Sequence, residues 1–246
     1  MTHDIIAQKY ERKENKSFNL SYKFCRFSEN LILNLSKGNI ISFSKKDQKL
    51  LYDYYQIQSE VVDFYIEESI KEINLKEINL DNSFCFYGYW KREENLEGLL
   101  WFEKNILPSI SKYIKIVVIG GGLNKEVKNR LNEYDNVEVL GFVKNPYKVI
   151  SKCKGLIAPL FQGAGVKVKV IESLACGTPV IGTDVAFEGI EFKYKNYLKR
   201  VDSPNNYIDA IQELNKIKLK DKIQLKDNFN SNYPKQKFRY ILSELE

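Results

Sequence analysis

The residues best suited to chemistry lie in one short stretch, GAGVKVKVIE, at positions 163–172. It places two lysines, Lys167 and Lys169, and one carboxylate, Glu172, directly after a glycine loop. The alternation of valine and lysine is typical of a half-buried strand, in which both lysines would face water. Helical spacing explains more of the segment, because its apolar and polar residues then separate onto two sides. We therefore expect a helix, which Gly177 ends.

Lysines at the start of a helix would face an anion rather than water. The first amides of a helix have no partner within it, so together with Lys167 or Lys169 they would bind a diphosphate. Glu172, one turn later, would accept hydrogen bonds from ribose hydroxyls. The alternative is an ordinary i,i+3 ion pair between Lys169 and Glu172 on a solvated helix face, and composition does not separate the two interpretations.

Three glycine turns follow predicted strands. Gly120-Gly121-Gly122 follows KIVVI, Gly141 follows VEVL, and Gln162-Gly163-Ala164-Gly165 follows LIAPLF. Ligands of open parallel sheets bind beyond the carboxyl ends of the strands, where glycine lets the backbone approach them closely. Each turn by itself is weak evidence, because a turn glycine often serves only the turn.

The elements that must position these residues alternate along the chain. Short β-branched or aromatic runs occur at 84–89, 115–120, 137–142, 155–161 and 178–183, with helical patterns between them. One helix covers EENLEGLLWFEKNILP and ends at Pro108, a second is capped by Asn124, and a third by Asn145 with Pro146 at its first position. This alternation predicts a Rossmann-like α/β domain, a parallel sheet with helices on both faces.

The first 80 residues are less regular. Apolar residues from Leu20 to Leu35 recur at helical spacing, with Gly38 as the expected end of that helix. NIISF and EVVDFY are expected strands, and Ser44 is the expected cap of a helix between them. We interpret residues 1–80 as the remnant of an α/β domain, 81–216 as the main domain and 217–246 as a connection with a C-terminal helix. Within the last segment, 217–232 is rich in Lys, Asp and Asn and is expected to be irregular.

Composition excludes several classes of protein. In 246 residues, 43% apolar content is enough for a core, and the net charge of +6 is scattered, as on a solvated surface that also suits anionic partners. The four cysteines lie far apart, which argues against a zinc site and a disulfide framework. His3 is the single histidine, so neither a metal site nor a Ser-His-Asp triad is expected. No apolar run approaches the ~18 residues of a membrane span, which predicts a cytoplasmic protein that can still rest on the inner face of a membrane.

The order of the motifs resembles a known family. FxGYWKREENLEGLLWF, KIVVIGGG, VEVLGFV and IAPLFQGAGVKVKVIESLACGTPVIGTDVAFEGI occur in sequence over residues 84–190. They resemble the donor half of retaining glycosyltransferases of the GT-B fold, in the large family-4 group. The resemblance implies transfer of a sugar from a UDP-sugar or GDP-sugar to a polysaccharide, glycolipid or other acceptor, with retention. It implies no cofactor, no obligatory metal and no nucleic-acid partner.

The resemblance also implies roles for individual positions. Glu172 matches the second glutamate of the family's E-x7-E element, which binds the donor ribose. The loop that wraps the sugar and diphosphate corresponds to Gly163, Ala164, Gly165 and Val166, with Lys167 or Lys169 neutralising phosphate. Phe142 and Val143 follow Gly141 beside the base, and Gly120 and Gly121 line the cleft. Residues near the reaction centre would be Lys91 and Arg92, a basic pair for the leaving diphosphate, and His3, for which the alternative is an ordinary surface histidine at the N-terminus.

Two departures from the family pattern bear on activity. Ala164 stands where the first glutamate of E-x7-E belongs, and Gln162 is the nearest polar substitute. Only about 80 residues precede the donor domain, fewer than a complete acceptor domain needs. The alternative is therefore a nucleotide-sugar-binding half-enzyme whose partner chain supplies the acceptor side, or a remnant without catalysis. A sugar-nucleotide epimerase would need acid/base carboxylates and histidines, and the histidine count argues against it.

Overall fold

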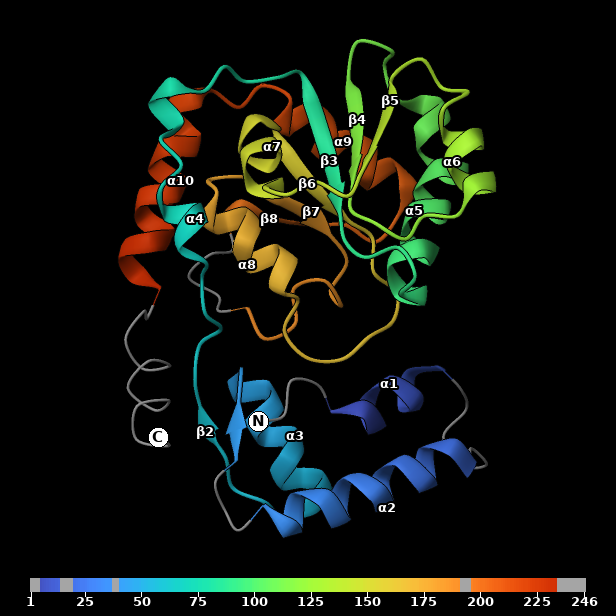
Figure 1. The fold of residues 1–246 in the computed structure, drawn as a ribbon, viewed down its shortest axis with the longest axis vertical. Coiled ribbons are helices and arrows are strands. Elements are labelled where there is room, and N and C mark those ends of the chain that lie inside the picture. The colour runs from blue at the N-terminus through green and yellow to red at the C-terminus, as the bar shows by residue number, and fades with distance from the viewer. Residues whose placement is uncertain (1–4, 14–19, 37–39, 191–195, 234–246) are drawn as a thin grey trace.

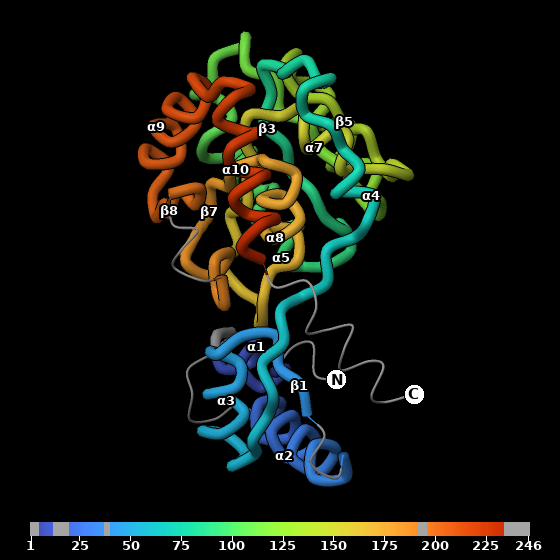
Figure 2. The backbone as a smooth tube through the Cα atoms, turned by 90° about the vertical axis from the view of Figure 1, so that its left-hand side faces the viewer, coloured from blue at the N-terminus to red at the C-terminus, as the bar shows by residue number. Residues whose placement is uncertain are grey.

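The computed structural model describes residues 5–13, 20–36, 40–190 and 196–233 (Figure 1). A larger part is built on a sheet, and a smaller N-terminal part lies beyond one end of it (Figure 1). The connection after the N-terminal part runs up one side of the molecule to the larger part (Figure 2). Within the described ranges, no helix combines the length and the apolar character that crossing a membrane requires.

The sheet of the larger part has six parallel strands in the described chain, in the order β5-β4-β3-β6-β7-β8. Their bounds are Ser83–Tyr87 (β3), Lys115–Ile119 (β4), Val137–Gly141 (β5), Gly155–Ala158 (β6), Val180–Gly182 (β7) and Leu198–Arg200 (β8). The five strands predicted from the sequence are confirmed, and β8 was not expected. The chain reverses its direction of winding between β3 and β6, which creates a crevice at their carboxyl ends.

Helices cover both faces of this sheet, as predicted. One face packs against α5 (Glu93–Asn105), α6 (Lys125–Leu131) and α9 (Pro204–Leu214), and the other against α4 (Glu68–Lys71), α7 (Pro146–Lys152), α8 (Val168–Ala175) and α10 (Leu219–Asn232). Side chains alternate between the faces, so Phe84 and Phe86 join the first core and Cys85 the second. Each core buries apolar side chains of strand and helix together, which is the main stabilising contribution.

The local signals for helix starts are confirmed. Asn124 Oδ1 accepts from the Val127 amide at 2.8 Å, and Asn145 Oδ1 accepts from the amide of Lys148. Pro146 occupies the first turn of α7, and a short 3-10 turn, η2 (Leu107–Ser109), follows α5. Side-chain caps satisfy amides that the helix itself leaves without partners.

The expectation of irregular structure at 217–232 is wrong, because α10 covers most of it. Its composition is misleading because two lysines point inward. The Lys222 ammonium is fully buried and donates to the carbonyl of Cys153 and to Thr178 Oγ1 at 2.7 Å. Leu225 and Phe229 complete the buried face. The helix predicted beyond this point lies outside the described residues.

The N-terminal part contains the two helices and two strands expected of it, and also a helix that was not expected, α1 (Ile6–Lys13). The expected elements are α2 (Leu20–Leu35), β1 (Ile41–Ser42), α3 (Lys45–Tyr55) and β2 (Glu60–Val61), with β1 and β2 parallel. Ser44 caps α3 by accepting from the Asp47 amide, as predicted, while Gly38 lies outside the described residues. A short 3-10 turn, η1 (Leu75–Glu77), follows α4. The helix α2 buries Leu33 and leaves large apolar side chains exposed, namely Leu20, Phe24, Phe27, Leu31, Ile32 and Leu35.

Candidate functional site

A cleft of about 1350 Å³ opens at the carboxyl ends of β3, β4, β5 and β6. It therefore includes the point where the winding of the sheet reverses, the usual ligand site of such folds. Its wall also contains Ile6, Lys9 and Tyr10 of α1, so both parts of the molecule contribute to it. The N-terminal part lies directly beyond the strand ends (Figure 1).

Most of the residues predicted from the sequence meet in this cleft. Its wall includes Lys91, Arg92, Gly120, Gly121, Phe142, Val143, Gly163, Ala164, Val166, Lys167, Lys169 and Glu172. Gln162 and Gly165 are not part of the wall. The Gln162 amide instead donates to Glu97 Oε2 at 2.7 Å, and its role as a sugar contact stays a prediction. His3 lies outside the described residues.

Two glycines allow the floor of the cleft to form. Gly120 has a φ of +121°, and a Cβ there would lie 1.8 Å from the Gly88 carbonyl oxygen. A Cβ at Gly88 would lie 2.9 Å from Asn95 Nδ2 and 3.5 Å from Lys169 Nζ. Glycine at these positions lets the ends of β3 and β4 touch and lets Lys169 approach the backbone.

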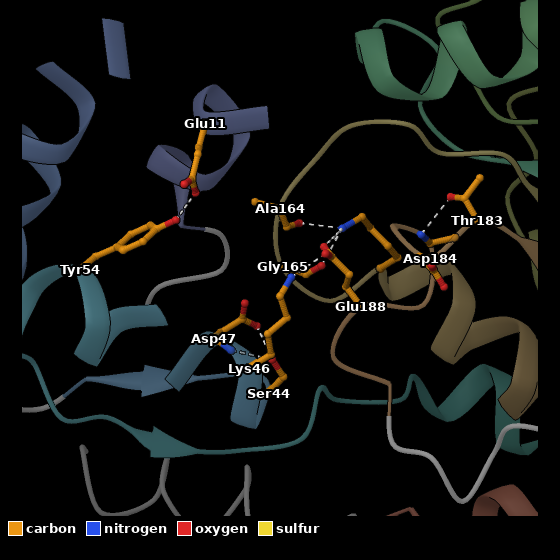
Figure 3. Close-up of polar contacts among 12 residues, drawn as sticks. Glu11, Ser44, Lys46, Asp47, Tyr54, Ala164, Gly165, Thr183, Asp184 and Glu188 are labelled. Atoms are coloured by element: carbon orange, nitrogen blue, oxygen red, sulfur yellow. Dashed lines mark hydrogen bonds and ion pairs between the residues drawn. The ribbon is translucent and has the colours of Figure 1, made fainter. Parts of the chain in front are cut away.

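The segment Val168–Ala175 forms the helix α8 and not a strand. Lys167 is its N-cap residue, and no side chain caps the first turn. The Lys167 ammonium donates to the carbonyls of Ala164 (3.0 Å) and Gly165 (2.6 Å) and lies 3.9 Å from a carboxylate oxygen of Glu188. Figure 3 shows both carbonyls and Glu188 around this contact. Lys167 therefore holds the glycine loop together.

Lys169, two residues later, has a different environment. Its ammonium donates to Asn95 Oδ1 at 2.6 Å, at the start of α5. Burial lowers the pKa of Lys169 to about 8; Glu94 opposes this shift, and Lys167 and Arg92 add to it. A cationic group removed from water beside other cations gains strongly from an anionic ligand. The part played by Asn95 and Glu94 was missed from the sequence, because only the fold brings α5 to α8.

Glu172 is held by a residue that the sequence did not indicate. Tyr147, on α7, donates its hydroxyl to Glu172 Oε1 at 2.7 Å. Burial raises the pKa of Glu172 to about 7, while the Tyr147 hydrogen bond lowers it and Glu67 raises it. In the sequence, the feature that could have indicated Tyr147 is its position directly after the Asn145-Pro146 helix cap. The Lys169–Glu172 ion pair is not formed, since each side chain binds another partner.

Ion pairs join the two parts of the molecule beside the cleft. Lys9 of α1 lies 3.2 Å from Glu94, and Lys46 of α3 lies 2.6 Å from Glu188. Figure 3 shows the second pair, with Lys46 reaching from the N-terminal part toward the glycine loop. Glu188 thus stands between Lys46 and Lys167, so the loop that follows β6 is linked to α3.

Curated relatives match part of this chain. One is an N-acetylgalactosamine-N,N'-diacetylbacillosaminyl-diphospho-undecaprenol 4-alpha-N-acetylgalactosaminyltransferase of Campylobacter jejuni, 30% identical over 166 residues, or 63% of this chain and 41% of the relative. Another is an uncharacterized glycosyltransferase of Methanocaldococcus jannaschii, 26% identical over 180 residues, or 67% of this chain and 42% of the relative. The chain thus spans about two fifths of these relatives.

Solved structures share the fold. TarM superposes with a TM-score of 0.73 at 15% identity, covering 97% of this chain and 48% of TarM. HepE of Anabaena, crystallised with UDP and glucose, superposes with a TM-score of 0.69 at 12% identity, covering 89% of this chain and 67% of HepE. The fold is thus of the GT-B type expected from the motifs.

A family model decides the classification. The model of the glycosyl transferases group 1 matches residues 81–216, which contain the six-stranded sheet and the cleft residues from Tyr87 to Glu172. Because this match covers more than half of the chain and agrees with the fold, the protein belongs to the glycosyl transferases group 1 family.

Proposed function

We propose that the protein transfers a sugar from a nucleotide diphosphate sugar to a polysaccharide, glycolipid or other acceptor, with retention at the sugar carbon. One observation carries the proposal: α8 presents a half-buried ammonium, Lys169, and a half-buried carboxylate, Glu172, to a single cleft at the switch point of the sheet. A nucleotide diphosphate offers the matching groups, since its diphosphate is anionic and its ribose hydroxyls are donors.

The position of each group in the cleft supports a role for it. Lys169 and the uncapped amides at the start of α8 bind the diphosphate, and Glu172 accepts from the ribose. Phe142 and Val143 lie beside the base, and the loop from Gly163 to Val166 contacts the sugar. Lys91 and Arg92 are exposed at the rim, where they stabilise the charge that grows on the departing nucleotide.

The donor is a UDP-sugar or a GDP-sugar. UDP is supported by HepE, which was crystallised with UDP and glucose in a fold of the same type. A lipid-linked acceptor is supported by the Campylobacter jejuni relative, whose name contains a diphospho-undecaprenol acceptor. The exposed basic pair at the rim suits such an anionic acceptor as well as the leaving group.

A second candidate is a half-enzyme that binds the nucleotide sugar and receives the acceptor side from a partner chain. The observation in its favour is the make-up of the cleft wall, to which the described residues of the N-terminal part contribute only Ile6, Lys9 and Tyr10 of α1. In this version the donor chemistry is unchanged, and turnover depends on the added partner.

Calorimetry with UDP, GDP and their sugars tests the donor site, followed by a donor-hydrolysis assay on the chain alone. We expect Glu172→Ala to weaken nucleotide binding at least about ten-fold, the loss of one hydrogen bond to a charged group. Glu138→Ala, on the exposed side of β5, is the matched control and should bind as the wild type does.

The outcomes separate the candidates. Binding with turnover supports the complete enzyme, and binding without turnover supports the half-enzyme. If no nucleotide binds, or if Glu172→Ala changes only the melting temperature and not the affinity, the donor site is wrong and both candidates fail.

A further inference from the structure

The hydroxyl of Tyr147 is the nearest described partner of the Glu172 carboxylate. It donates to Glu172 Oε1 at 2.7 Å, and the tyrosine itself is only 8% exposed. Its ring packs edge to face against Tyr87, at the end of β3, with 6.4 Å between the ring centroids. Both residues line the cleft together with Glu172.

The backbone at Tyr147 is positioned by the residues that begin its helix. Asn145 caps α7 and Pro146 occupies its first turn, so these two residues fix where the helix starts and where it places Tyr147. A buried tyrosine has two side-chain torsions and a rigid ring, whereas Glu172 has three torsions. The tyrosine hydroxyl is thus the fixed partner, and the carboxylate is the group being held.

The charges around Glu172 act in opposite directions. Glu67, an exposed residue just before α4, raises the pKa of Glu172, whereas the Tyr147 hydrogen bond lowers it. Tyr87 on β3 and Cys176 at the end of α8 are the other titratable groups that interact with this carboxylate. Burial, Glu172 and Glu67 all raise the pKa of Tyr147, so its hydroxyl stays protonated and remains a donor near neutral pH.

We propose that Tyr147 is a positioning residue, which keeps Glu172 ionised and aimed at the ribose hydroxyls of the donor, and that Glu67 opposes it through charge. This inference rests on the proposed donor site, because it takes Glu172 as the ribose acceptor. It goes further by assigning a function to two residues that lie on other elements than α8. It also makes the contribution of the ribose hydroxyls to donor binding depend on pH through a single carboxylate.

The test compares UDP with 2′,3′-dideoxy-UDP, which lacks the ribose hydroxyls. Calorimetry between about pH 5.5 and 8.5 yields the ratio of the two affinities, in which the titrations of the phosphates and of Lys169 cancel. For the wild type, we expect the preference for UDP to rise through the pKa of Glu172, about 7, because the ionised carboxylate accepts more strongly.

Two variants should move this midpoint in opposite directions. Tyr147→Phe removes the donor, which raises the pKa of Glu172, so the midpoint should move by about one pH unit to the alkaline side. Glu67→Gln removes a repelling charge, so the midpoint should move to the acid side by a few tenths of a pH unit, an effect that salt reduces. Glu68→Gln, the exposed neighbour, is the matched control and should leave the midpoint unchanged.

A double-mutant cycle distinguishes an effect that acts through the charge of Glu172 from a general loss of structure in Tyr147→Phe. In a Glu172→Gln background, Tyr147→Phe should have no further effect on the UDP preference, because the charge it supports is gone. Should Tyr147→Phe fold poorly, the exposed Glu67→Gln still tests the direction of the shift.

The proposal is overturned if Tyr147→Phe weakens UDP and its dideoxy analogue equally, or if neither variant moves the midpoint. If Glu172→Ala itself leaves UDP binding unchanged, the donor site fails and not merely the role of Tyr147. If Glu172→Ala weakens UDP binding while Tyr147→Phe does not, only the present inference fails.

Discussion

Lys167 and Lys169 are two residues apart, and their ammonium groups contact different parts of the protein. Lys167 satisfies the carbonyls of Ala164 and Gly165, so its ammonium is already engaged with the glycine loop. Lys169 contacts Asn95, and the cations beside it, Lys167 and Arg92, lower its pKa further after burial. We therefore infer that Lys169 binds the diphosphate and that Lys167 shapes the loop around it.

Replacing each lysine by methionine should separate these two functions. Lys169→Met should weaken UDP binding about 10- to 100-fold, the range for one charge-assisted contact, and should remove the decline in affinity of the wild type as pH rises through about 8. Lys167→Met should instead lower the melting temperature by roughly 2–6 °C, because two carbonyls lose their donor. Calorimetry and thermal unfolding measure the two effects, with Lys112→Met, at an exposed lysine, as control. Equal loss of affinity in both variants would contradict the assignment.

The helix α10 supports the candidate site, which the sequence did not indicate. Its inward lysines reach across to other elements, Lys222 to the carbonyl of Cys153 and Lys226 to the carbonyl of Ile70. The helix packs against α8, which carries Lys169 and Glu172. Support for the candidate site therefore extends to a segment near the end of the described chain.

Lys222→Ala should destabilise the protein by about 3–5 kcal/mol, because it leaves a cavity and removes the donor to two buried oxygens. The Thr178 hydroxyl would keep its bond to the Ile150 carbonyl, which limits the loss. Urea unfolding monitored by circular dichroism measures this difference. Lys220→Ala, exposed on the same helix, is the control and should change stability by no more than about 0.5 kcal/mol. A similar result for both variants would show that Lys222 has no structural role.

For the molecule as a whole, the cleft is shared by two parts, and ion pairs connect them beside it. Lys46–Glu188 and Lys9–Glu94 bridge them on the sides of the cleft. Partly exposed pairs of this kind contribute about 1 kcal/mol at most, so each adds only modestly to the contact between the two parts. The Lys46 bridge ends at the same Glu188 that faces Lys167.

Lys46→Glu should therefore favour opening of the two parts. Limited proteolysis of the connection at 62–67 should become about five-fold faster, which corresponds to roughly 1 kcal/mol. In about 1 M salt the wild type should approach the variant, because the pair is screened. Lys49→Glu on the same helix breaks only its local pair with Asp53 and should leave the cleavage rate unchanged. Unchanged cleavage in Lys46→Glu would mean that other contacts hold the parts together.

Local patterns account for the elements that were predicted correctly. The strands β3 to β7, the caps Asn124, Asn145 and Ser44, and the helical character of α8 depend on residues close in sequence, and the structure confirms them. The prediction for the segment that forms α10 was wrong, because its buried lysines give it the composition of a solvated segment. Composition records the charge of a side chain but not the carbonyl that it will meet.

The α/β class, the glycine turns at strand ends and the common helix of Lys169 and Glu172 could be predicted from the sequence, because all of these follow from the spacing of residues close together in the chain. The contacts between elements could not be predicted in this way, namely those of Tyr147 with Glu172, of Lys9 with Glu94 and of Lys46 with Glu188. Those contacts join residues on different elements. Their partners are selected by how the sheet winds and packs, which no local pattern specifies.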